Sequence, residues 1–363
     1  MAFCVYSNQY GKITLDVVIG GRVVSIDKIR LKNFTIFKDL SVQLSDGINV
    51  FIGQNGTGKT HLLKAVYAAC ELTQDKENHA KLRDYFRKYL FSLNLFHDIK
   101  HTNLEINITN ENDKKIKAIH QSNSLLQNNG QEMAIGDCYD IILPDNIIFN
   151  SIFMPCKDMI THSKGFLAIS EKYRGFPFDK TLTDIIRRAN MLPLNTPPEL
   201  ALPIIPYLNK ILDGEVDTQD DEFIIKKNDG RTVNFAVEAE GIKKIGLLWR
   251  LLMNESITEG SILLWDEPEA NLNPEYLPII VDCLLELSRH NVQILVSTHN
   301  YIFAKYFDVK RKESDNVSYH ALYIAHMAAE CETKNHFTEL EHNAIGTAFD
   351  KLLDEVYHAG IGD

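Results

Sequence analysis

Short apolar runs alternate with amphipathic stretches along the first part of the chain, and this pattern predicts strands followed by a helix. Residues 22–34 and 40–53 are typical of strands. Residues 59–72 carry their apolar side chains at helical spacing. The first 75 residues therefore predict a β-rich start that leads into one amphipathic helix.

The same alternation returns after residue 222 and extends to the end of the chain. The stretch 222–238 predicts a hairpin, because an Asn-Asp-Gly turn signal separates its two apolar runs. The further elements expected are a helix opening at Gly241, a strand at 261–266, a helix at 276–290, a strand at 292–299, an edge strand at 316–326 and a final helix at 343–360. Apolar strands that alternate with helices indicate a parallel sheet covered on both faces.

The middle of the chain, residues 76–221, changes character. Its expected elements are a charged helix at 76–93, a hairpin at 104–120, a strand at 146–155 and helices between 163 and 213. We therefore expect residues 1–75 and 222–363 to form one α/β domain. Residues 76–221 are expected to be a mostly helical insertion that acts as a lid or binds a partner.

Composition and charge limit the classes of partner. Of the 363 residues, 45% are hydrophobic and 24% are charged, which is typical of a globular domain that buries a core. The formal net charge of −11 does not support nucleic-acid binding, which usually brings a basic excess. A basic cluster at 81–90 keeps nucleic acid as an open alternative, beside the reading of a solvated helix face.

Three further features indicate a cytoplasmic protein without a membrane partner. No apolar run approaches the roughly 18 residues that a membrane helix requires. The first residues lack the basic and apolar regions of a signal peptide. The six cysteines form no CxxC pair, which argues against a disulfide framework or a zinc site.

The octapeptide GQNGTGKT at 53–60 fits the pattern G-x-x-x-x-G-K-[ST] between an apolar strand and a helix. Glycines let backbone N–H groups surround phosphates, and the following helix adds its positive N-terminal dipole. Lys59 is expected to reach the β- and γ-phosphates, and the Thr60 hydroxyl to ligate Mg²⁺. The predicted ATP-binding residues are Gly53, Gln54, Asn55, Gly56, Thr57, Gly58, Lys59, Thr60, His61 and Asp266.

Acidic residues follow the apolar strand 261–266 in the sequence SILLWDEPEANLNP. Asp266 stands at the carboxyl end of a buried strand, where α/β folds bind ligands, and is expected to hold Mg²⁺. Glu267 can polarise or orient the attacking water. Glu269 has no assigned role, and capping of the next turn is the alternative for this acidic run.

A third motif, VQILVSTHN at 292–300, is an apolar strand that ends in Ser-Thr-His. A lone histidine is more often structural than catalytic. His299, however, ends a core strand 33 residues after Asp266, where it could contact a γ-phosphate. We therefore predict a catalytic role for His299.

Taken together, these motifs and the N-terminal stretch KIRLKNFTIFKDLSVQLSDGINVFIG resemble the ABC-type ATPase heads of the SMC/RecF/OLD group. The resemblance covers roughly residues 22–75 and 230–310. It implies a P-loop NTPase fold with a mixed sheet, an antiparallel N-terminal β part and a helical/β insertion. It also implies a Walker A loop, a Walker B strand with catalytic Glu267, a D-loop at 270–273 that includes Asn271, and His299 as switch residue.

The resemblance further implies that two heads pair face to face around ATP, each supplying a signature motif to the other. In the family this motif reads roughly Leu-Ser-x-Gly before a long helix, and the aligned residues here are Glu238 to Gly241. Gly241 is retained beside Glu240, but Ala239 replaces the serine, which removes a hydroxyl worth roughly 1.5–3 kcal/mol at a charged phosphate. Lys243 or Lys244 could replace that contact, and ordinary solvated lysines are the alternative.

A glutamine-bearing loop is expected in this family between Walker A and the signature. The best positional match is FMPCKDMI at 153–160, which resembles the Phe-x-Pro-x-Asp segment of RecF-like heads. It carries no glutamine. Lys157 or Asp158 is therefore expected near the Mg²⁺.

The leading hypothesis is an ATPase that dimerises or forms a higher oligomer through its ATP-bound heads and acts as a switch. The insertion lacks the sustained heptads of SMC coiled coils, and about 64 residues after His299 are too few for a nuclease domain. A separate effector, such as a nuclease or toxin of an antiphage or DNA-repair system, is expected by analogy. One alternative is an ATP-gated scaffold with negligible turnover. A second is a transporter ATPase subunit, and the missing signature serine counts against it.

Overall fold

The computed structural model describes residues 25–74, 103–110, 115–121, 126–128, 131–133, 138–142, 148–172 and 180–361. The expected charged helix at 76–93 and the basic cluster at 81–90 lie outside these ranges. Within them, no helix combines the length and the apolar character that crossing a membrane requires.

The centre of the fold is a sheet with the strand order β16-β15-β3-β14-β13-β9. The strands from β15 to β9 run parallel, and β16 pairs antiparallel with β15. Its strands are β3 (Ile48–Gly53), β9 (Ser151–Met154), β13 (Ile262–Asp266), β14 (Gln293–Ser297), β15 (Val317–Ala325) and β16 (Ala328–Lys334). The strands β3, β14 and β13 are parallel neighbours, so their carboxyl ends meet at one edge of the sheet.

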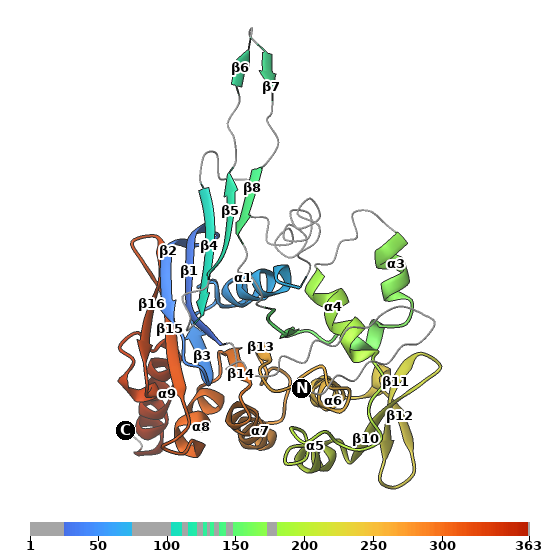
Figure 1. Ribbon diagram of the computed structural model, residues 1–363. Coiled ribbons are helices and arrows are strands. Elements are labelled where there is room, and N and C mark those ends of the chain that lie inside the picture. Colours follow the sequence, from blue (N-terminus) through green and yellow to red (C-terminus); the bar gives the residue numbers. More distant parts are fainter. Residues whose placement is uncertain are drawn as a thin grey trace.

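A second, antiparallel sheet has the order β2-β1-β4-β5-β8 and faces the central sheet. Its strands are β1 (Ile26–Phe34), β2 (Phe37–Gln43), β4 (Asn103–Asn110), β5 (Lys115–Gln121) and β8 (Cys138–Ile142). A small hairpin, β6 (Leu126–Asn128) and β7 (Gln131–Met133), lies beyond this sheet at the top of Figure 1.

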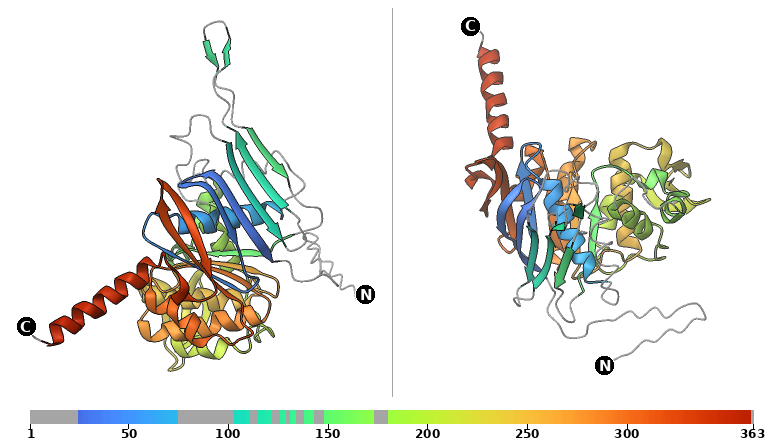
Figure 2. Two further views of the ribbon diagram at one scale, coloured as in Figure 1. Left: turned by 90° about the vertical axis from the view of Figure 1, so that its left-hand side faces the viewer. Right: turned by 90° about the horizontal axis from the view of Figure 1, so that it is seen from above.

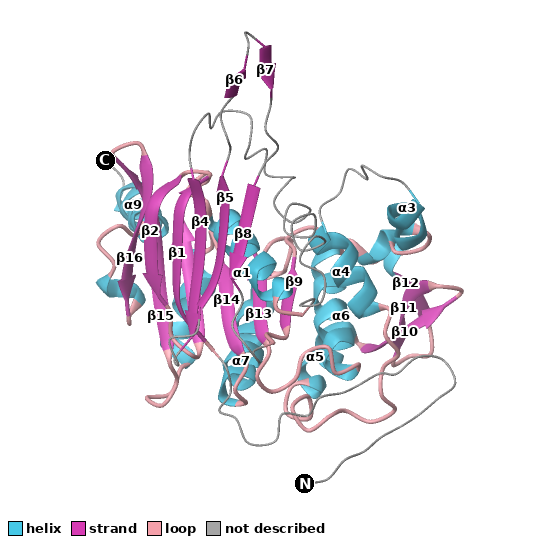
Figure 3. Ribbon diagram, turned by 45° about the horizontal axis from the view of Figure 1, so that its top comes forward, coloured by secondary structure: helices cyan, strands magenta, loops and turns pink. Residues whose placement is uncertain are grey.

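Helix α1 (Lys59–Leu72) lies between the two sheets (Figures 1 and 3). Leu31 of β1, Leu62 and Val66 of α1 and Leu264 of β13 are all fully buried in the core between these layers. Because α1 begins directly after the glycine-rich loop, this packing fixes the loop against the central sheet.

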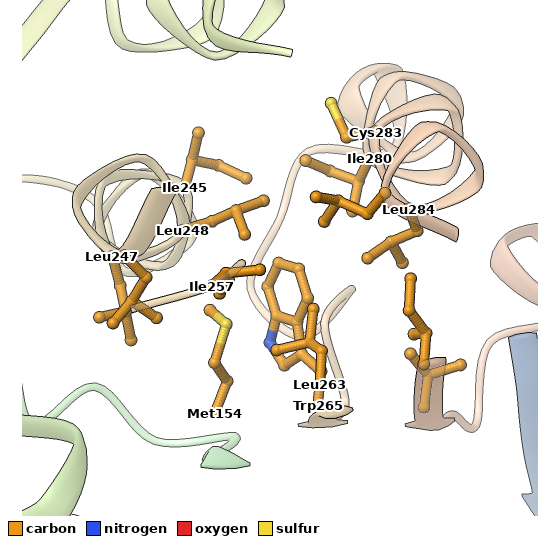
Figure 4. Packing of buried hydrophobic residues seen from close by; sticks show 14 of the residues in the cluster. Met154, Ile245, Leu247, Leu248, Ile257, Leu263, Trp265, Ile280, Cys283 and Leu284 are labelled. Carbon is orange, nitrogen blue, oxygen red and sulfur yellow. The ribbon is translucent and has the colours of Figure 1, made fainter. Parts of the chain in front are cut away.

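The other face of the central sheet is covered by α6 (Glu240–Met253), α7 (Leu277–Arg289) and α8 (Tyr301–Lys310). Figure 4 shows Trp265 of β13 between Ile245 and Leu248 of α6 on one side and Leu284 of α7 on the other. Strand residues alternate between the two faces, so Trp265 faces α6 and α7 while Leu264 faces α1. Helix α6 is thus packed onto the strand that carries Asp266.

A lateral region adjoins α6 and completes the body of the molecule. It contains α3 (Phe166–Lys172), α4 (Lys180–Ala189), α5 (Ile205–Leu212), β10 (Gly214–Gln219), β11 (Glu222–Lys227), β12 (Thr232–Asn234) and the 3₁₀ turns η2 (Ile160–His162) and η3 (Phe235–Val237). The turns η4 (Pro274–Tyr276) and η5 (Phe337–Glu339) precede α7 and α9 (Ala344–Ile361). Helix α9 extends away from the body (Figure 2).

Two expectations from the sequence need correction. The described part of 76–221 is not mostly helical, because β4 pairs with β1 and β9 pairs with β13, and both strands complete sheets of the head. The stretch 316–326 was expected as an edge strand. It forms β15, which lies inside the sheet because β16 covers its outer side. The boundaries of an inserted domain remain a prediction.

Candidate active site

The glycine-rich loop between β3 and α1 has a backbone that only glycine allows at two positions. Gly53 and Gly58 adopt φ angles of 148° and 93°. A Cβ atom at Gly53 would collide with the carbonyl oxygen of Leu322 in β15, and one at Gly58 with the ring of Phe37 in β2. The loop is therefore held between β15 and β2 in a conformation that requires glycine, and it leads directly into the N-terminus of α1.

The Lys59 side chain lies along this loop. Its Nζ donates to the carbonyl oxygens of Gly53 at 2.8 Å and Gln54 at 3.0 Å. Burial lowers the pKa of Lys59 to about 8, an effect opposed by the carboxylates of Glu267 and Asp266. The ammonium group thus lies within the field of the acidic residues at the end of β13.

Thr60 and Asp266, which were each expected to hold Mg²⁺, lie in contact with each other. The Thr60 hydroxyl lies 3.0 Å from both carboxylate oxygens of Asp266, and the Ser297 hydroxyl also donates to that carboxylate. Burial raises the pKa of Asp266, although both hydroxyls oppose this shift.

A hydroxyl and a carboxylate in contact fit Mg²⁺, which takes oxygen ligands and usually completes its shell with water and substrate phosphates. The described residues hold no cluster of three or more His, Cys, Asp or Glu side chains that could bind a metal by themselves. The donor set of Thr60 and Asp266 therefore suits an ion that arrives with a nucleotide.

Glu267 and His299 face each other across the ends of β13 and β14. His299 Nε2 lies 3.6 Å from Glu267 Oε1. Burial lowers the pKa of His299, and the nearby Lys59 cation lowers it further. These effects favour the neutral imidazole, which can accept a proton or donate a hydrogen bond.

Glu269, which had no assigned role, supports the segment that carries His299. Its Oε1 accepts from the Thr298 hydroxyl at 2.6 Å and from the His299 backbone N–H at 3.2 Å. Burial raises the pKa of Glu269. Glu269 thus joins the loop after β13 to the end of β14.

The signature stretch begins α6 next to the loop after β13. Ala239 is the N-cap residue of α6 and provides no side-chain cap. A Cβ atom at Gly241 would collide with the Asn271 carbonyl oxygen, and Asn271 itself adopts a φ of 64°. The glycine is therefore required by the close approach of the predicted D-loop in the same chain, whatever it does at a partner's nucleotide.

The two signature lysines are not solvated, which corrects one of the alternatives considered for them. Lys243 is 4% exposed, and its Nζ lies 2.7 Å from Glu240 and 4.0 Å from Asp158. Lys244 is 5% exposed and donates to the Glu267 carbonyl oxygen at 2.9 Å. Both ammonium groups are thus engaged by their own chain. A contact of Lys243 with a partner's phosphate remains a prediction.

The segment after β9 places a different residue at the site from those expected. Cys156 Sγ lies 3.2 Å from Glu267 Oε2. Lys157 is exposed, and Asp158 accepts from the backbone N–H groups of Ile160 and Thr161, so it caps its own 3₁₀ turn. The sequence signal for Cys156 is its position two residues after the apolar strand that ends at Met154. The structure shows that this strand, β9, pairs with β13.

The remaining loop residues divide by exposure. Gln54, Asn55 and Gly56 are exposed, whereas Thr57 is buried and donates to the Gln54 carbonyl oxygen at 2.9 Å. His61 Nδ1 is buried without a hydrogen-bond partner among the described residues, and burial lowers the pKa of this histidine. Their predicted contacts with ATP stay predictions.

Two family models match the chain. One, described as an AAA domain, putative AbiEii toxin, Type IV TA system, matches residues 145–304, and a second, described as an AAA domain, matches residues 28–139. Between them they include the glycine-rich loop, the strand that ends in Asp266 and the segment that carries His299.

Curated relatives include the DNA replication and repair protein RecF of Cytophaga hutchinsonii, 49% identical over 45 residues, or 12% of each chain. RecF of Bacillus cytotoxicus is 30% identical over 108 residues, or 26% of each chain. The chain thus spans about a quarter or less of the length of these relatives.

Solved structures similar to this chain include an SMC head domain from Thermotoga maritima, with 16% identity and a TM-score of 0.44, over 85% of this chain and 98% of that one. An Smc head domain with an extended coiled coil, bound to the C-terminal domain of ScpA and derived from Pyrococcus furiosus, has 13% identity and a TM-score of 0.49, over 92% and 100%.

Proposed function

Because this chain is an ABC-type ATPase head of the SMC/RecF group, we propose that it binds ATP with Mg²⁺ and hydrolyses it where β3, β13 and β14 end. The observation that carries the proposal is the convergence of three motifs, distant in sequence, at this edge. Thr60 contacts Asp266 at 3.0 Å, and His299 lies 3.6 Å from Glu267.

In the proposed mechanism, the backbone N–H groups of the glycine-rich loop and the Lys59 ammonium group bind the phosphates. Thr60 and Asp266 would hold Mg²⁺, which neutralises phosphate charge when it is bound. Glu267 orients the attacking water and accepts its proton, a role that is typically worth about 10²–10⁴-fold in rate. His299 donates a hydrogen bond to the γ-phosphate from a position fixed by Glu269.

We further propose that ATP joins two copies of the head and that hydrolysis releases them. In such a pair, Gly241 and the backbone at the start of α6 of one copy would contact the nucleotide of the other. The proposed role of this ATP-dependent pairing is to control a separate effector protein. Support for this comes from the relatives named as replication and repair proteins and from the family description that includes a putative toxin.

The decisive experiment compares the wild-type chain with Glu267→Gln. We measure phosphate release and, by light scattering after gel filtration, the molar mass with and without Mg-ATP. The wild type is expected to turn over ATP. The variant is expected to bind ATP, to lose at least about 100-fold in rate and to elute as a dimer. A variant that stays monomeric with saturating Mg-ATP would contradict the dimer.

One observation favours a second candidate, an ATP-gated scaffold. Ala239 offers no hydroxyl to a partner's phosphate and no side-chain cap to α6. Such a scaffold would assemble with ATP, and its wild-type turnover would be as slow as that of Glu267→Gln. The same two measurements therefore separate the two functions.

A further inference from the structure

Glu267 adopts a backbone conformation that residues other than glycine seldom take. Its φ angle is 48°, in the left-handed region. Its N–H donates to the Ser297 carbonyl oxygen at 3.0 Å, and its own carbonyl accepts from Ala270 N–H at 3.1 Å. A strained conformation of this kind persists only where the surroundings fix it, and it often occurs at functional sites.

Lys244 supplies one of the groups that hold this conformation. Its Nζ reaches from the second turn of α6 and donates to the Glu267 carbonyl oxygen at 2.9 Å. The side chain is buried, and the carboxylates of Glu269, Glu267 and Asp266 oppose the lowering of its pKa by burial. Burying a lysine is costly unless its charge is compensated, and this lysine is compensated by the backbone and the carboxylates at the end of β13.

Cys156 contacts the other end of the same residue. Its thiol lies 3.2 Å from Glu267 Oε2, while His299 Nε2 lies 3.6 Å from Oε1. Burial, together with the hydrogen bond to Glu267, raises the pKa of Cys156 to about 12. The group is therefore a neutral thiol at physiological pH and can donate to the carboxylate.

We propose that Lys244 and Cys156 are positioning residues for Glu267, Lys244 by fixing its backbone carbonyl and Cys156 by orienting its carboxylate. This inference rests on the proposed ATPase function. The two residues come from different elements, α6 and the segment after β9, and meet at one glutamate. They act on the placement of the proposed catalytic carboxylate and leave the phosphate-binding loop unchanged.

The first test replaces the lysine. Lys244→Met keeps the length of the side chain and removes the donor, and Lys310→Met is the control because Lys310 pairs with Asp282 between α8 and α7. We expect Lys244→Met to lower kcat about tenfold, as loss of one hydrogen bond to a buried group predicts, while the Kd for ATP stays within about twofold. Lys310→Met is expected to retain the wild-type kcat.

The second test replaces the cysteine. Cys156→Ala removes the donor and Cys156→Ser retains one, with Cys331→Ala as the control for loss of a thiol on β16. We expect Cys156→Ala to lower kcat about fivefold and Cys156→Ser to recover most of the rate, both with the Kd for ATP unchanged. Loss of packing alone would not be repaired by serine, because its hydroxyl is smaller than the thiol.

The closing measurement combines each substitution with Glu267→Gln. If Lys244 and Cys156 act through the carboxylate, neither Lys244→Met nor Cys156→Ala slows the residual turnover of Glu267→Gln any further. Equal fold losses in both backgrounds, or a wild-type kcat in both single variants, would overturn the positioning roles while leaving the ATPase proposal intact. Wild-type turnover no faster than that of Glu267→Gln would overturn both.

Discussion

The two ends of the parallel strands in the central sheet are both polar, but their polar groups are used differently. The amino ends line a cavity of about 390 Å³ whose walls include Ser25, Gly47, Ser261, Arg289, Gln293 and Asn316. The buried Gln293 amide there exchanges hydrogen bonds of 2.8 Å with both backbone groups of Ile26 and also donates to Ser45. Arg289 is paired with Asp315.

The carboxyl ends bring together several charged side chains whose pKa values burial shifts. Lys59 and Asp266 are buried, Glu269 is half-buried, and Glu267 has a left-handed backbone. One oxygen of Glu269 and Nδ1 of His61 lack a hydrogen-bond partner among the described residues. A polar cavity can thus be lined by groups that already have hydrogen-bond or ion-pair partners within the chain. Charged groups whose pKa values are shifted by burial, rather than by pairing with each other, and polar atoms without a partner are better indicators of a site that receives a ligand.

The largest expected effect is the loss of ATP binding at the carboxyl ends. Lys59→Ala removes charge-assisted hydrogen bonds to phosphate and should raise the Kd for Mg-ATP at least about 100-fold. The free energy of unfolding without nucleotide should not fall, because the buried ammonium is costly to desolvate. Calorimetric titration with Mg-ATP and chemical denaturation measure the two quantities. A Kd within about threefold of the wild type would contradict the comparison.

Gln293→Ala should have the opposite profile at the amino ends. It leaves the buried N–H and C=O of Ile26 without their partner, which should lower the free energy of unfolding by about 3 kcal/mol. The Kd for ATP of the folded protein should stay within about twofold. Ser314→Ala, at an exposed position of the same cavity, is the matched control and should change stability by less than about 0.5 kcal/mol. A larger effect of Gln293→Ala on ATP binding than on the free energy of unfolding would contradict a purely structural role for the amino ends.

Glu71 lies near the amino end of β9, and burial shifts its pKa as it does at the carboxyl ends. Its carboxylate accepts a hydrogen bond from the Ser151 hydroxyl at 2.8 Å. Burial raises the pKa of Glu71 to about 7, above its ordinary value of 4.5. The folded state therefore holds this proton more tightly than the unfolded state, so the contribution to stability falls as pH rises between these values. From about pH 5 to 7 the loss should be about 2 kcal/mol.

This pH dependence is checked by denaturation of the wild type and Glu71→Gln across that range. Glutamine keeps the shape and cannot titrate, so the difference between the two stability curves should slope with pH. Parallel curves would show that the pKa of Glu71 is the same in the folded and unfolded states.

The smallest expected effect concerns the signature. Ala239→Ser adds a hydroxyl that can cap α6 and should raise the free energy of unfolding by about 0.5–1 kcal/mol. If the partner's nucleotide lies against this residue, the ATP-bound dimer should also tighten several-fold. Ala239→Gly is the comparison variant, because glycine is within a few tenths of a kcal/mol of serine as an N-cap but has no hydroxyl to offer a phosphate. A stabilised monomer with unchanged dimerisation would remove Ala239 from the proposed partner contact.

The sequence predicted the strands β3, β13 and β14 of the central sheet, because each motif carries its own apolar strand. The helices at 59–72, 276–290 and 343–360 were also predicted to within a residue or two. Local pattern is sufficient where an element's neighbours in space are its neighbours in sequence, or where a motif requires a strand end.

Pairings between distant segments could not be predicted in the same way. The strand β16 has the sequence AAECETK, and its charged residues do not indicate a strand beside β15. Solvation was one of the two alternatives for Lys243 and Lys244, because lysines are seldom buried. The approach of Glu240 and of the Glu267 carbonyl explains their burial. Cys156 was missed because a lone cysteine carries no motif, and its meaning depends on the register of β9 against β13.

The place of β15 has a consequence for how the chain acquires its structure during synthesis. The loop-bearing strand β3 pairs with β14, which begins at Gln293, and with β15, whose residues 317–322 oppose residues 48–53. A ribosome must therefore release residues as far as 322 before β3 has both neighbours. Long-range parallel pairing of this kind folds slowly and exposes unpaired strands meanwhile. For this protein, translation of residues 293–322 is the step that allows the nucleotide-binding loop to become rigid.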